Sequence, residues 1–363
     1  MGDLKRRLLG RIASSGPITF AEFMEAALYD PQEGFYARPR VGERGHFVTS
    51  PHVSPAFGDL VARQLAECWE VLDRPRPFSV VELGAGDGTL GAQLVAAVGS
   101  VPDLAEAFRY SAVERSAGAR VALVARGFEA HPDLRSVGPV KGCVLANEVL
   151  DNVPFRRVRR RGDALVEVLV GAEGDSLVEV EHHAPKEVLA AVDGRIRPGQ
   201  DRPVPSAEPV RDLAAILECG YAFVFDYGFE AGESPGPVHA YRDQDVLPEV
   251  LADPGSRDVT AAVDWEAIAA EAGRAGFQVW GPVPQREALL ALGYRMWSAG
   301  VRRRQAEAEE SGDWRAATRL YGERSRASIL IDPAKLGGLH LLALGTEGLP
   351  PPAAVFGDRD TGC

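Results

Sequence analysis

The sequence predicts an α/β fold built on a doubly wound, mostly parallel β-sheet. Short apolar runs of strand length alternate with segments of helical periodicity, and four of these runs end in an acidic residue. A hydrophobic content of 45% beside 25% charged residues is typical of a globular chain with a sizeable core. We expect two additions to the sheet: an N-terminal helical extension, and an inserted β-hairpin with a helical substrate subdomain.

The first 75 residues are expected to form a helical and loop extension that covers the active site. Thr19, followed three residues later by Glu22, is a capping-box pattern, so a helix should begin there and end near Tyr29. From Phe57 to Leu72 the apolar residues follow helical spacing. This stripe predicts a second helix that packs on the core.

The stretch from Val80 to Leu90 is the most informative part of the sequence. It predicts a buried strand, a tight turn with three glycines at alternate positions, and the first residues of a helix. Glycines in such a turn let a ligand lie directly against the main chain. A dinucleotide-binding turn needs glycine at its sixth position, but the sixth residue counted from Gly84 is Thr89. A dinucleotide is therefore disfavoured.

The acid Glu82 lies two residues before the first glycine of this turn. Its carboxylate would place negative charge where the cationic methionyl portion of a sulfonium cofactor would lie. The pattern therefore favours S-adenosyl-L-methionine, and the order Glu-Leu-Gly-Ala-Gly-Asp-Gly resembles the cofactor motif of class I methyltransferases. The alternative is an ordinary glycine-rich turn between a strand and a helix.

Two further predicted strands end in polar residues. One ends in Glu114, 32 residues beyond the first acid, where a class I methyltransferase commonly has a carboxylate for the ribose hydroxyls. Another ends in Asn147 and Glu148, and Asp151 follows three residues later. Ligands bind outside the carboxyl ends of strands in a doubly wound sheet, so these groups should face one site. The alternatives are a solvated acid for Glu114 and a turn cap for Asp151.

The rest of the chain completes the sheet around an insertion. Alternating strands at 165–170 and 177–181 predict a hairpin, and a proline-rich loop follows at 198–209. A hydrophobic strand then ends at Asp226 and Tyr227. Later elements are expected in this order: a small-sheet strand at 238–242, a helix capped by Asp264, a strand at 277–280, charged helices at 288–323, a last strand at 339–344 and a frayed tail from Thr346.

These elements suggest a division of the chain into five segments. The extension at 1–75 precedes a cofactor-binding half at 76–155 and an inserted hairpin and loop at 156–210. The second half of the core, with a helical insertion, is expected at 211–345, and a flexible tail at 346–363.

Composition narrows the classes of partner. The net charge of −12 disfavours a nucleic-acid substrate. The four cysteines lack the spacing of metal ligands, so we expect no metal site and buried thiols in a reducing compartment. We find neither the apolar core of a secretory signal nor a run of about eighteen apolar residues. We therefore expect a cytoplasmic protein that has no membrane partner.

Motifs along nearly the whole chain match the pattern of one family. They are Tyr29-Asp30-Pro31 with Gly34-Phe35-Tyr36, Phe47-Val48-Thr49-Ser50-Pro51 with Ser54 and Phe57-Gly58, Glu82 to Leu90, Asn147 to Asp151, Asp226-Tyr227-Gly228 and Asp258-Val259-Thr260. In these motifs the sequence resembles the MidA-like methyltransferases. They are class I S-adenosyl-L-methionine-dependent enzymes, and they include a mitochondrial complex I assembly factor that acts on protein arginine.

The resemblance implies a Rossmann-like class I methyltransferase core, S-adenosyl-L-methionine as cofactor, and a protein, peptide or small molecule as methyl acceptor. The positions expected at the cofactor are Glu82, Gly84, Ala85, Gly86, Gly88, Thr89, Glu114, Asn147, Thr49 and Ser50. The candidate catalytic residues are Glu148, Asp151 and His52, and the candidate substrate-binding residues are Tyr36, His46, Tyr227 and Asp226.

Methyl transfer is an in-line displacement, so the site must above all align the donor and the acceptor. The nitrogen lone pairs of an arginine side chain are delocalised, so nearby carboxylates must localise its charge and accept a proton as the new bond forms. Glu148 and Asp151 are the candidates for this role. His52 becomes a candidate general base if the acceptor is a hydroxyl or an amine, because imidazole titrates near neutral pH.

The sequence departs from the family pattern at three positions. His46 and His52 stand where the family usually has acids, and Asn152 stands where it usually has a small alanine. Two imidazoles in place of acids would weaken a site built to hold a guanidinium.

Three hypotheses follow: transfer to an arginine nitrogen of a protein or peptide, transfer to a small-molecule hydroxyl or amine, and a non-catalytic assembly factor with the same fold. Association into a homodimer is left open.

Overall fold

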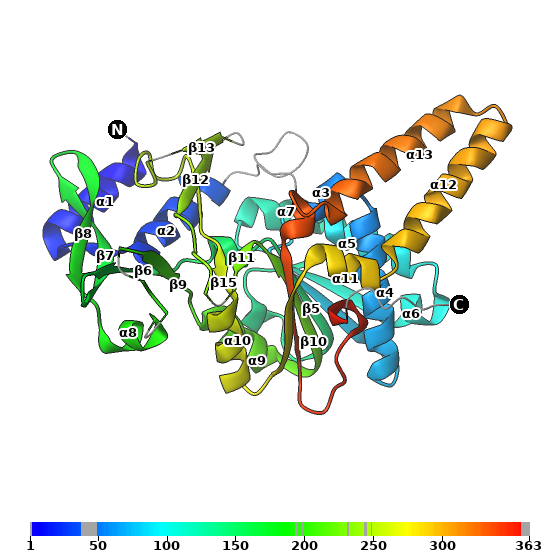
Figure 1. Ribbon diagram of the computed structural model, residues 1–363, viewed down its shortest axis with the longest axis horizontal. Coiled ribbons are helices and arrows are strands. Elements are labelled where there is room, and N and C mark those ends of the chain that lie inside the picture. The colour runs from blue at the N-terminus through cyan, green and yellow to red at the C-terminus, as the bar shows by residue number, and fades with distance from the viewer. Residues whose placement is uncertain are drawn as a thin grey trace.

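The computed structural model describes residues 2–37, 49–192, 195–197, 199–230, 232–242, 245–247 and 249–356. Figure 1 shows a central sheet between layers of helices, with a second sheet and the N-terminal helices on one side of it. A helical hairpin projects from the opposite side. Within the described residues, no helix combines the length and the apolar character that crossing a membrane requires.

The central sheet has seven strands in the order β16-β17-β10-β5-β2-β3-β4. The parallel strands are β2 (Phe78–Leu83), β3 (Phe108–Val113), β4 (Glu129–His131), β5 (Val140–Asn147) and β10 (Leu217–Asp226). β17 (His340–Gly345) runs antiparallel between β10 and β16 (Gln278–Pro284). The predicted doubly wound, mostly parallel sheet is confirmed. Its strand order reverses between β2 and β5, which is where such sheets bind ligands.

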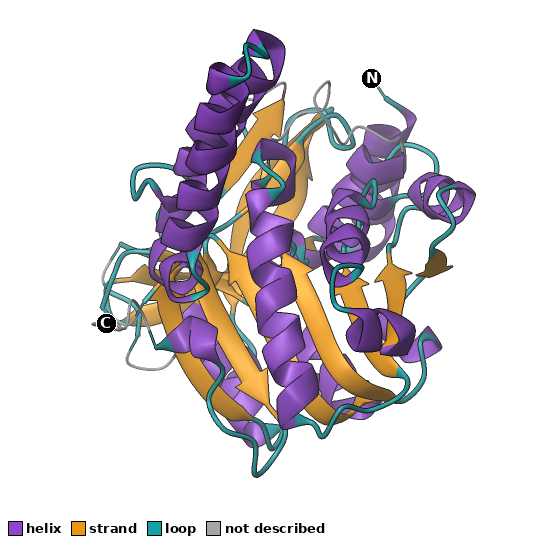
Figure 2. Cartoon of the chain, turned by 90° about the vertical axis from the view of Figure 1, so that its right-hand side faces the viewer, coloured by secondary structure: helices purple, strands orange, loops and turns teal. Residues whose placement is uncertain are grey.

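Side chains of the central strands alternate between two buried layers. Val80 and Cys143 face one layer, and their neighbours Val81 and Val144 face the other. The first layer is covered by α4 (Ala56–Val71), α5 (Thr89–Val98), α6 (Pro102–Ala107) and α11 (Gln285–Ala291), and the second by α9 (Glu208–Ile216) and α10 (Trp265–Arg274). Figure 2 shows helices in front of and behind the strands. Burial on both faces explains the continuous apolar runs from which the sequence predicts these strands.

A second, antiparallel sheet joins the N-terminal segment to the insertion. Its strands are β1 (Ile18–Thr19), β6 (Arg156–Arg161), β7 (Ala164–Glu173), β8 (Ser176–His183) and β9 (Asp201–Val204). β1 pairs with β7. α1 (Asp3–Ser15) and α2 (Phe20–Tyr29) pack on this sheet around a core of their own. At the start of α2 the predicted capping box is confirmed: Thr19 Oγ1 accepts the Glu22 N–H, and the Glu22 carboxylate accepts the Thr19 N–H.

The remaining elements lie around these two sheets. The helices are α3 (Ser50–Val53), α7 (Ala117–Ala125), α8 (Lys186–Val192), and the projecting pair α12 (Tyr294–Glu310) and α13 (Trp314–Ala327). The short 3₁₀ turns are η1 (Phe35–Ala37), η2 (Leu134–Ser136), η3 (Leu150–Asn152), η4 (Ser328–Ile331), η5 (Leu336–Gly338) and η6 (Ala353–Val355). β11 (Gly228–Phe229) pairs with β15 (Val263–Asp264), and β12 (His239–Arg242) pairs with β13 (Asp245–Leu247) and β14 (Asp258–Thr260).

Two expectations about loops are wrong. The proline-rich stretch 198–209, expected as a loop, contains β9, which pairs with β6 along the edge of the second sheet. The tail expected to fray from Thr346 packs on α4 as far as residue 356. There the N–H of the buried Ala354 donates to Gln64 Oε1 at 2.9 Å. In both cases the pairing partner is distant in sequence, so local composition does not reveal it.

We expect Thr19→Ala to lower the free energy of unfolding by about 1 kcal/mol, because it removes the side-chain cap of a well-buried helix. Thr19→Ser keeps the capping oxygen and should stay within about 0.5 kcal/mol of the unsubstituted protein. Urea unfolding followed by circular dichroism measures both values. Equal losses in the two variants would assign the effect to the threonine methyl group instead of the cap.

Candidate active site

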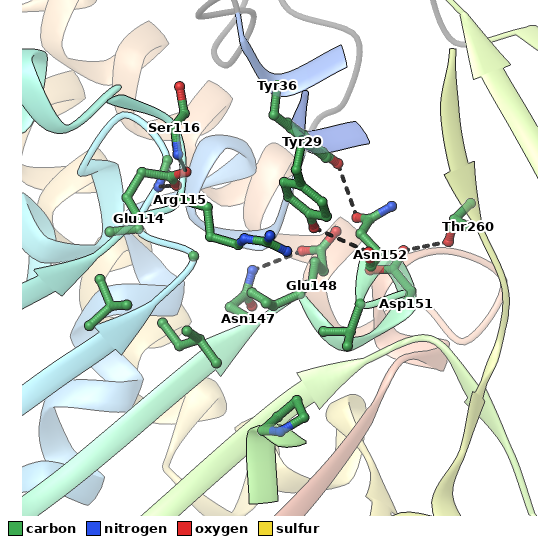
Figure 3. A pocket seen from close by; sticks show the side chains of 18 of the residues that line it. Tyr29, Tyr36, Glu114, Arg115, Ser116, Asn147, Glu148, Asp151, Asn152 and Thr260 are labelled. Atoms are coloured by element: carbon green, nitrogen blue, oxygen red, sulfur yellow. Dashed lines mark hydrogen bonds between the residues drawn. The ribbon is translucent and has the colours of Figure 1, made fainter. Parts of the chain in front are cut away.

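A cavity of about 950 Å³ opens at the switch point of the central sheet. Its walls come from the carboxyl ends of β2, β3 and β5, from α2 and η1, and from β12 and β14. Figure 3 shows side chains from these distant segments converging on one space. Pockets of roughly 300–1,000 Å³ hold small ligands. The cavity is therefore large enough for a cofactor together with an acceptor side chain.

The glycine-rich turn after β2 forms one wall of the cavity. Gly84 has a φ of +70°, and a Cβ built there would lie 2.5 Å from Val149 Cγ2. Only glycine therefore fits at the point where the turn meets the loop after β5. Gly84, Ala85, Gly86 and Thr89, four of the residues expected at the cofactor, all line the cavity.

Glu82 lies at the end of β2, beneath this turn, and is only 5% exposed. Its Oε2 accepts a short hydrogen bond of 2.5 Å from the Tyr110 hydroxyl. Burial, with the nearby charges of Asp87 and Glu114, raises the pKa of Glu82 to about 8, although the Tyr110 bond acts in the opposite direction. Glu82 thus lines the cavity as a buried carboxyl, and a cationic ligand bound there would favour its ionised form.

Glu114 closes the neighbouring strand end. Its Oε2 accepts the Gly86 N–H at 3.0 Å, and its Oε1 accepts the Ser116 N–H at 2.8 Å. Burial raises the pKa of this carboxyl. Each carboxylate oxygen accepts one of these two bonds and keeps a lone pair, so the group can still accept bonds from two adjacent hydroxyls of a ligand.

His52 ties α3 to the glycine-rich turn. Its Nδ1 lies 2.8 Å from Thr49 Oγ1, and its Nε2 lies 3.2 Å from Asp87 Oδ2. Burial of the Asp87 carboxyl opposes ionisation, but hydrogen bonds from His52 and Thr89 outweigh it and lower the pKa of Asp87 to about 2. Both ring nitrogens of His52 therefore have partners inside the protein, which does not favour the role of a general base.

Glu148 lines the other end of the cavity, which we call the acceptor end. It adopts a φ of +54°, a conformation rare for residues other than glycine, as the chain turns out of β5. Its Oε1 accepts the Ser50 N–H and the Asn147 Nδ2–H, both at 3.0 Å. Burial raises the pKa of Glu148 to about 7, and the charge of Asp151 adds to the effect.

Asp151 lies beside Glu148 in η3. Its Oδ2 accepts the Thr260 hydroxyl at 2.7 Å, and burial raises the pKa of this carboxyl to about 6. Its Oδ1 is buried without a hydrogen-bond partner in the described part of the chain, and so is Asn147 Oδ1. A buried acceptor without a donor is costly. Both atoms belong to residues that line the cavity, so a ligand with several N–H groups would satisfy them.

Asp226, predicted to bind substrate, has another role. It is 1% exposed, and its Oδ2 accepts the Val149 N–H at 3.0 Å and the Leu150 N–H at 2.7 Å. Burial and the charge of Asp151 raise its pKa. Asp226 does not line the cavity, and instead orients the loop that carries the acceptor-end carboxyls. Tyr227, next to it, does line the cavity and is 56% exposed.

Ser50 and Gly88 are also placed differently from the prediction. The Ser50 side chain is fully buried and donates to Gln285 Oε1 at 3.3 Å, so only its N–H serves the site. Gly88 is the N-cap residue directly before α5, and a Cβ there would lie 2.7 Å from Leu123 Cδ2. Neither residue lines the cavity. His46 lies outside the described residues.

Two residues of the site do not stand out in the sequence: Tyr110, which lies behind the cavity wall, and Arg115, which lines it. Tyr110 occupies a mid-strand position that predicts a core residue, and it reaches Glu82 only because Gly91 opposite it has no side chain. Arg115 stacks its guanidinium 3.7 Å from the centre of the Tyr29 ring and pairs with Glu25. Arg115 directly follows Glu114, the acid after β3. This position at the ligand-binding edge of the sheet is the signal that would have identified it.

The acceptor end also contains a polar network that the sequence does not predict. The hydroxyl of Tyr36, a predicted substrate-binding residue, lies within hydrogen-bond distance of the buried Asp258 and of Asn152 and shares its one hydrogen between them. Burial, with the charge of Asp151, raises the pKa of Asp258 to about 8. The motif containing Asp258 is visible in the sequence, but its distance of more than a hundred residues from the other two groups hides the contact.

The cofactor end fits S-adenosyl-L-methionine. The buried Glu82 carboxyl suits a cation, Glu114 suits the ribose hydroxyls, and the glycine at position 84 leaves space that a Cβ would fill. Beyond Glu114 the wall includes the apolar Ala119 and Leu134, which suit the face of an adenine. No group of three potential metal ligands occurs among the described residues.

Comparisons with known proteins agree with this geometry. Residues 60–283 match a family model described as "Putative S-adenosyl-L-methionine-dependent methyltransferase". The mitochondrial protein arginine methyltransferase NDUFAF7 homolog of Drosophila melanogaster is 31% identical over 306 residues, which cover 74% of this chain and 69% of the relative. The mitochondrial protein arginine methyltransferase NDUFAF7 of Mus musculus is 28% identical over 377 residues, which cover 93% of this chain and 83% of the relative.

The fold has a solved counterpart that holds a product of the cofactor. A crystal structure from Burkholderia thailandensis, bound to S-adenosyl-homocysteine, matches with a TM-score of 0.84 at 27% identity. The match covers 98% of this chain and 95% of the other. A native crystal structure from the same organism matches with a TM-score of 0.80.

The buried carboxyls predict that the stability of the ligand-free protein falls as the pH rises. Glu82 has a folded pKa of about 8 against a usual value of 4.5, so the fold favours its protonated form. The resulting stability is complete below about pH 4 and is lost as the pH rises through 8. Glu82→Gln mimics the protonated group and should shrink the fall in Tm between pH 5 and pH 8 by about 2 °C or more. An unchanged fall would show that Glu82 holds no proton in this range.

Proposed function

The chain belongs to the family of S-adenosyl-L-methionine-dependent methyltransferases, and we propose that it methylates a guanidino nitrogen of arginine in a protein or peptide. The bound cofactor supplies an electrophilic methyl group carried on a sulfonium. Selection of the acceptor, its alignment and the removal of its proton are left to the residues of the acceptor end.

The observation that carries this proposal is the excess of hydrogen-bond acceptors at the acceptor end. Glu148, Asp151 and Asp258 bring three carboxyls with raised pKa values, and the buried Oδ1 atoms of Asn147 and Asp151 have no donor in the described chain. A guanidinium offers five N–H donors in a planar fork and no acceptor. A hydroxyl offers one donor, so it would leave one of these atoms unpaired.

The charges of the acceptor end support a cationic acceptor. Among the described residues that line the cavity, the one arginine is Arg115, which pairs with Glu25 on the N-terminal side. Within the described part of the chain, no lysine and no second arginine lines the cavity beside the acceptor-end carboxyls. Ionising them together in a buried site is unfavourable until a positive charge enters.

The carboxyls also supply the base that arginine requires. As the guanidino nitrogen forms its bond to the methyl carbon, the bond from carbon to sulfur breaks and the nitrogen must release one proton. Glu148 or Asp151 accepts it, since pKa values of about 7 and 6 suit a base that works near neutral pH. Ser50, Asn147 and Thr260 hold these carboxyls in place through the bonds described above.

The comparisons add independent support. The relatives at 31% and 28% identity are named as protein arginine methyltransferases, and both alignments extend over more than two thirds of each chain. The alternative of a small-molecule hydroxyl or amine rests on His46 and His52, which stand where the family usually has acids. His46 lies outside the described residues, and the His52 imidazole is held at both nitrogens by Thr49 and Asp87.

Incubation with labelled S-adenosyl-L-methionine and a peptide library tests the proposal. Calorimetry first measures cofactor binding. Mass spectrometry then locates any methyl group on arginine-containing peptides and on matched peptides with lysine in place of arginine. We expect mass gain on guanidino nitrogens only. Methylation confined to lysine or to small molecules would overturn the arginine assignment, and absent cofactor binding would favour a non-catalytic protein.

Removing the carboxylates should affect the transfer more than cofactor binding. We expect Glu148→Gln and Asp151→Asn each to lower kcat/KM for an arginine peptide by about 100-fold, since general-base catalysis contributes at least that factor. The Kd for the cofactor should change by less than about threefold. Glu173→Gln, an equivalent change in the exposed β7–β8 hairpin, is the matched control. Equal losses in cofactor affinity and kcat/KM would place Glu148 at the donor instead.

The pH dependence of the reaction follows from the same groups. Protonated Glu148 and Asp151 neither attract a cation nor accept a proton, so kcat/KM should rise between pH 6 and pH 8 as carboxyls with pKa values near 6 and 7 ionise. Asp151→Asn should remove the lower part of this rise. A rate that falls across this interval would contradict the assignment of a carboxylate base.

A further inference from the structure

Asn152 joins the segments that surround the acceptor end. Its Nδ2 donates to Asp258 Oδ1 at 3.0 Å and to the Val259 carbonyl at 3.3 Å. Its Oδ1 accepts the Tyr36 hydroxyl, and its backbone carbonyl accepts the Tyr29 hydroxyl, both at 3.1 Å. Figure 3 shows the two tyrosines above η3, each with a dashed line to Asn152. One side chain therefore satisfies donors and acceptors from separate parts of the chain.

The contacts close into a ring of three side chains. The Tyr36 hydroxyl lies 3.0 Å and 3.1 Å from the two carboxylate oxygens of Asp258, in addition to its contact with Asn152. Asn152 is 8% exposed and Asp258 is 3% exposed. We call these three residues the Tyr36–Asn152–Asp258 cluster. Buried polar clusters with every member paired hold their surroundings in one arrangement.

Each member of the cluster has a near neighbour that lines the acceptor end. The Tyr29 ring stacks on Tyr36 at 5.6 Å between centroids. Asp151 precedes Asn152 in η3, and Thr260, two residues beyond Asp258 in β14, donates to Asp151. The cluster thereby fixes one aromatic ring and one catalytic carboxyl relative to each other, although they come from opposite walls of the cavity.

We propose that Asn152 is a positioning residue that holds the acceptor end in its working shape before any acceptor binds. It does so by bonding the N-terminal segment and β14 to the loop that carries Asp151. The inference rests on the proposed function for the identity of the acceptor, but the shape of the wall is a property of the chain by itself. An alanine at this position keeps the backbone carbonyl that accepts the Tyr29 hydroxyl, but it has no side-chain group that can bond to Tyr36, Asp258 or Val259.

The energetic consequence is confined to one end of the cavity. Loss of the Asn152 side chain removes the bonds to Tyr36, Asp258 and Val259, and leaves a buried carboxyl with one donor fewer. The cofactor end is bonded through Glu82, Glu114 and Gly86, none of which contacts the cluster. If the wall is flexible before binding, its residues must become ordered when the acceptor binds. This loss of conformational entropy lowers the affinity for the acceptor.

Hydrogen exchange on the full-length, ligand-free protein tests the wall directly. We expect Asn152→Ala and Tyr36→Phe to speed exchange at residues 35–37 and 258–260 by about tenfold. The controls Gln305→Ala and Tyr321→Phe likewise remove a side-chain amide and a tyrosine hydroxyl, but on the projecting helices, and should change neither segment. Unchanged exchange in both cluster variants would overturn the proposal, even if the enzyme proves to use another acceptor.

Kinetics separates a positioning role from a general loss of structure. In Asn152→Ala the KM for an arginine peptide should rise about tenfold, with the Kd for the cofactor and the Tm nearly unchanged. The double variant Asn152→Ala, Tyr36→Phe should lose no more than the worse single variant, because both act through one cluster. Additive losses, or an equal loss of cofactor affinity, would contradict the assignment. If the unsubstituted enzyme methylates no arginine, the proposed function fails while the exchange result still decides this inference.

Discussion

Burial of acidic side chains at the carboxyl ends of the parallel strands is the constraint on which this structure depends. Glu114, Glu148 and Asp226 each end or follow a strand, and each accepts backbone N–H groups from segments near the same edge of the sheet: the loops after β2, β3 and β5, and the start of α3. The loops have few other ways to satisfy their N–H groups so close to the sheet. The same carboxyls therefore hold the loops in place. Glu114 and Glu148 also line the cavity, whereas Asp226 supports a loop that lines it, so the edge of the sheet at the cavity is held by many side-chain bonds.

This arrangement carries an electrostatic cost that a cationic ligand would offset. The raised pKa values of Glu82, Glu148 and Asp258 show that the fold, without a ligand, opposes their ionisation at neutral pH. A cation at either end of the cavity would favour the ionised forms. Ligand binding should therefore be linked to the release of protons from these carboxyls.

The sequence predicts the cofactor end better than the acceptor end for a physical reason. The turn from Gly84 to Thr89 is built from consecutive residues, and Glu114 follows the next strand along the chain, at the spacing from Glu82 that the resemblance to class I methyltransferases implies. The prediction fails for Asp226, because an acid at a strand end looks the same in sequence whether it faces a cavity or bonds to the adjacent loop. It misses Asn152 as a contact of Asp258 because about a hundred residues separate them.

The two ends of the cavity consequently differ in how well they tolerate amino-acid substitutions. An altered residue in the glycine-rich turn meets backbone strain or a close neighbour such as Val149, so few substitutions fit there. The acceptor end is assembled by side-chain bonds between the N-terminal segment, η3 and β14, and one exchanged side chain can loosen or re-form those bonds. A single fold can keep its methyl donor and still vary its acceptor. In this chain the position to examine first is Asn152, because it contacts both of the other segments.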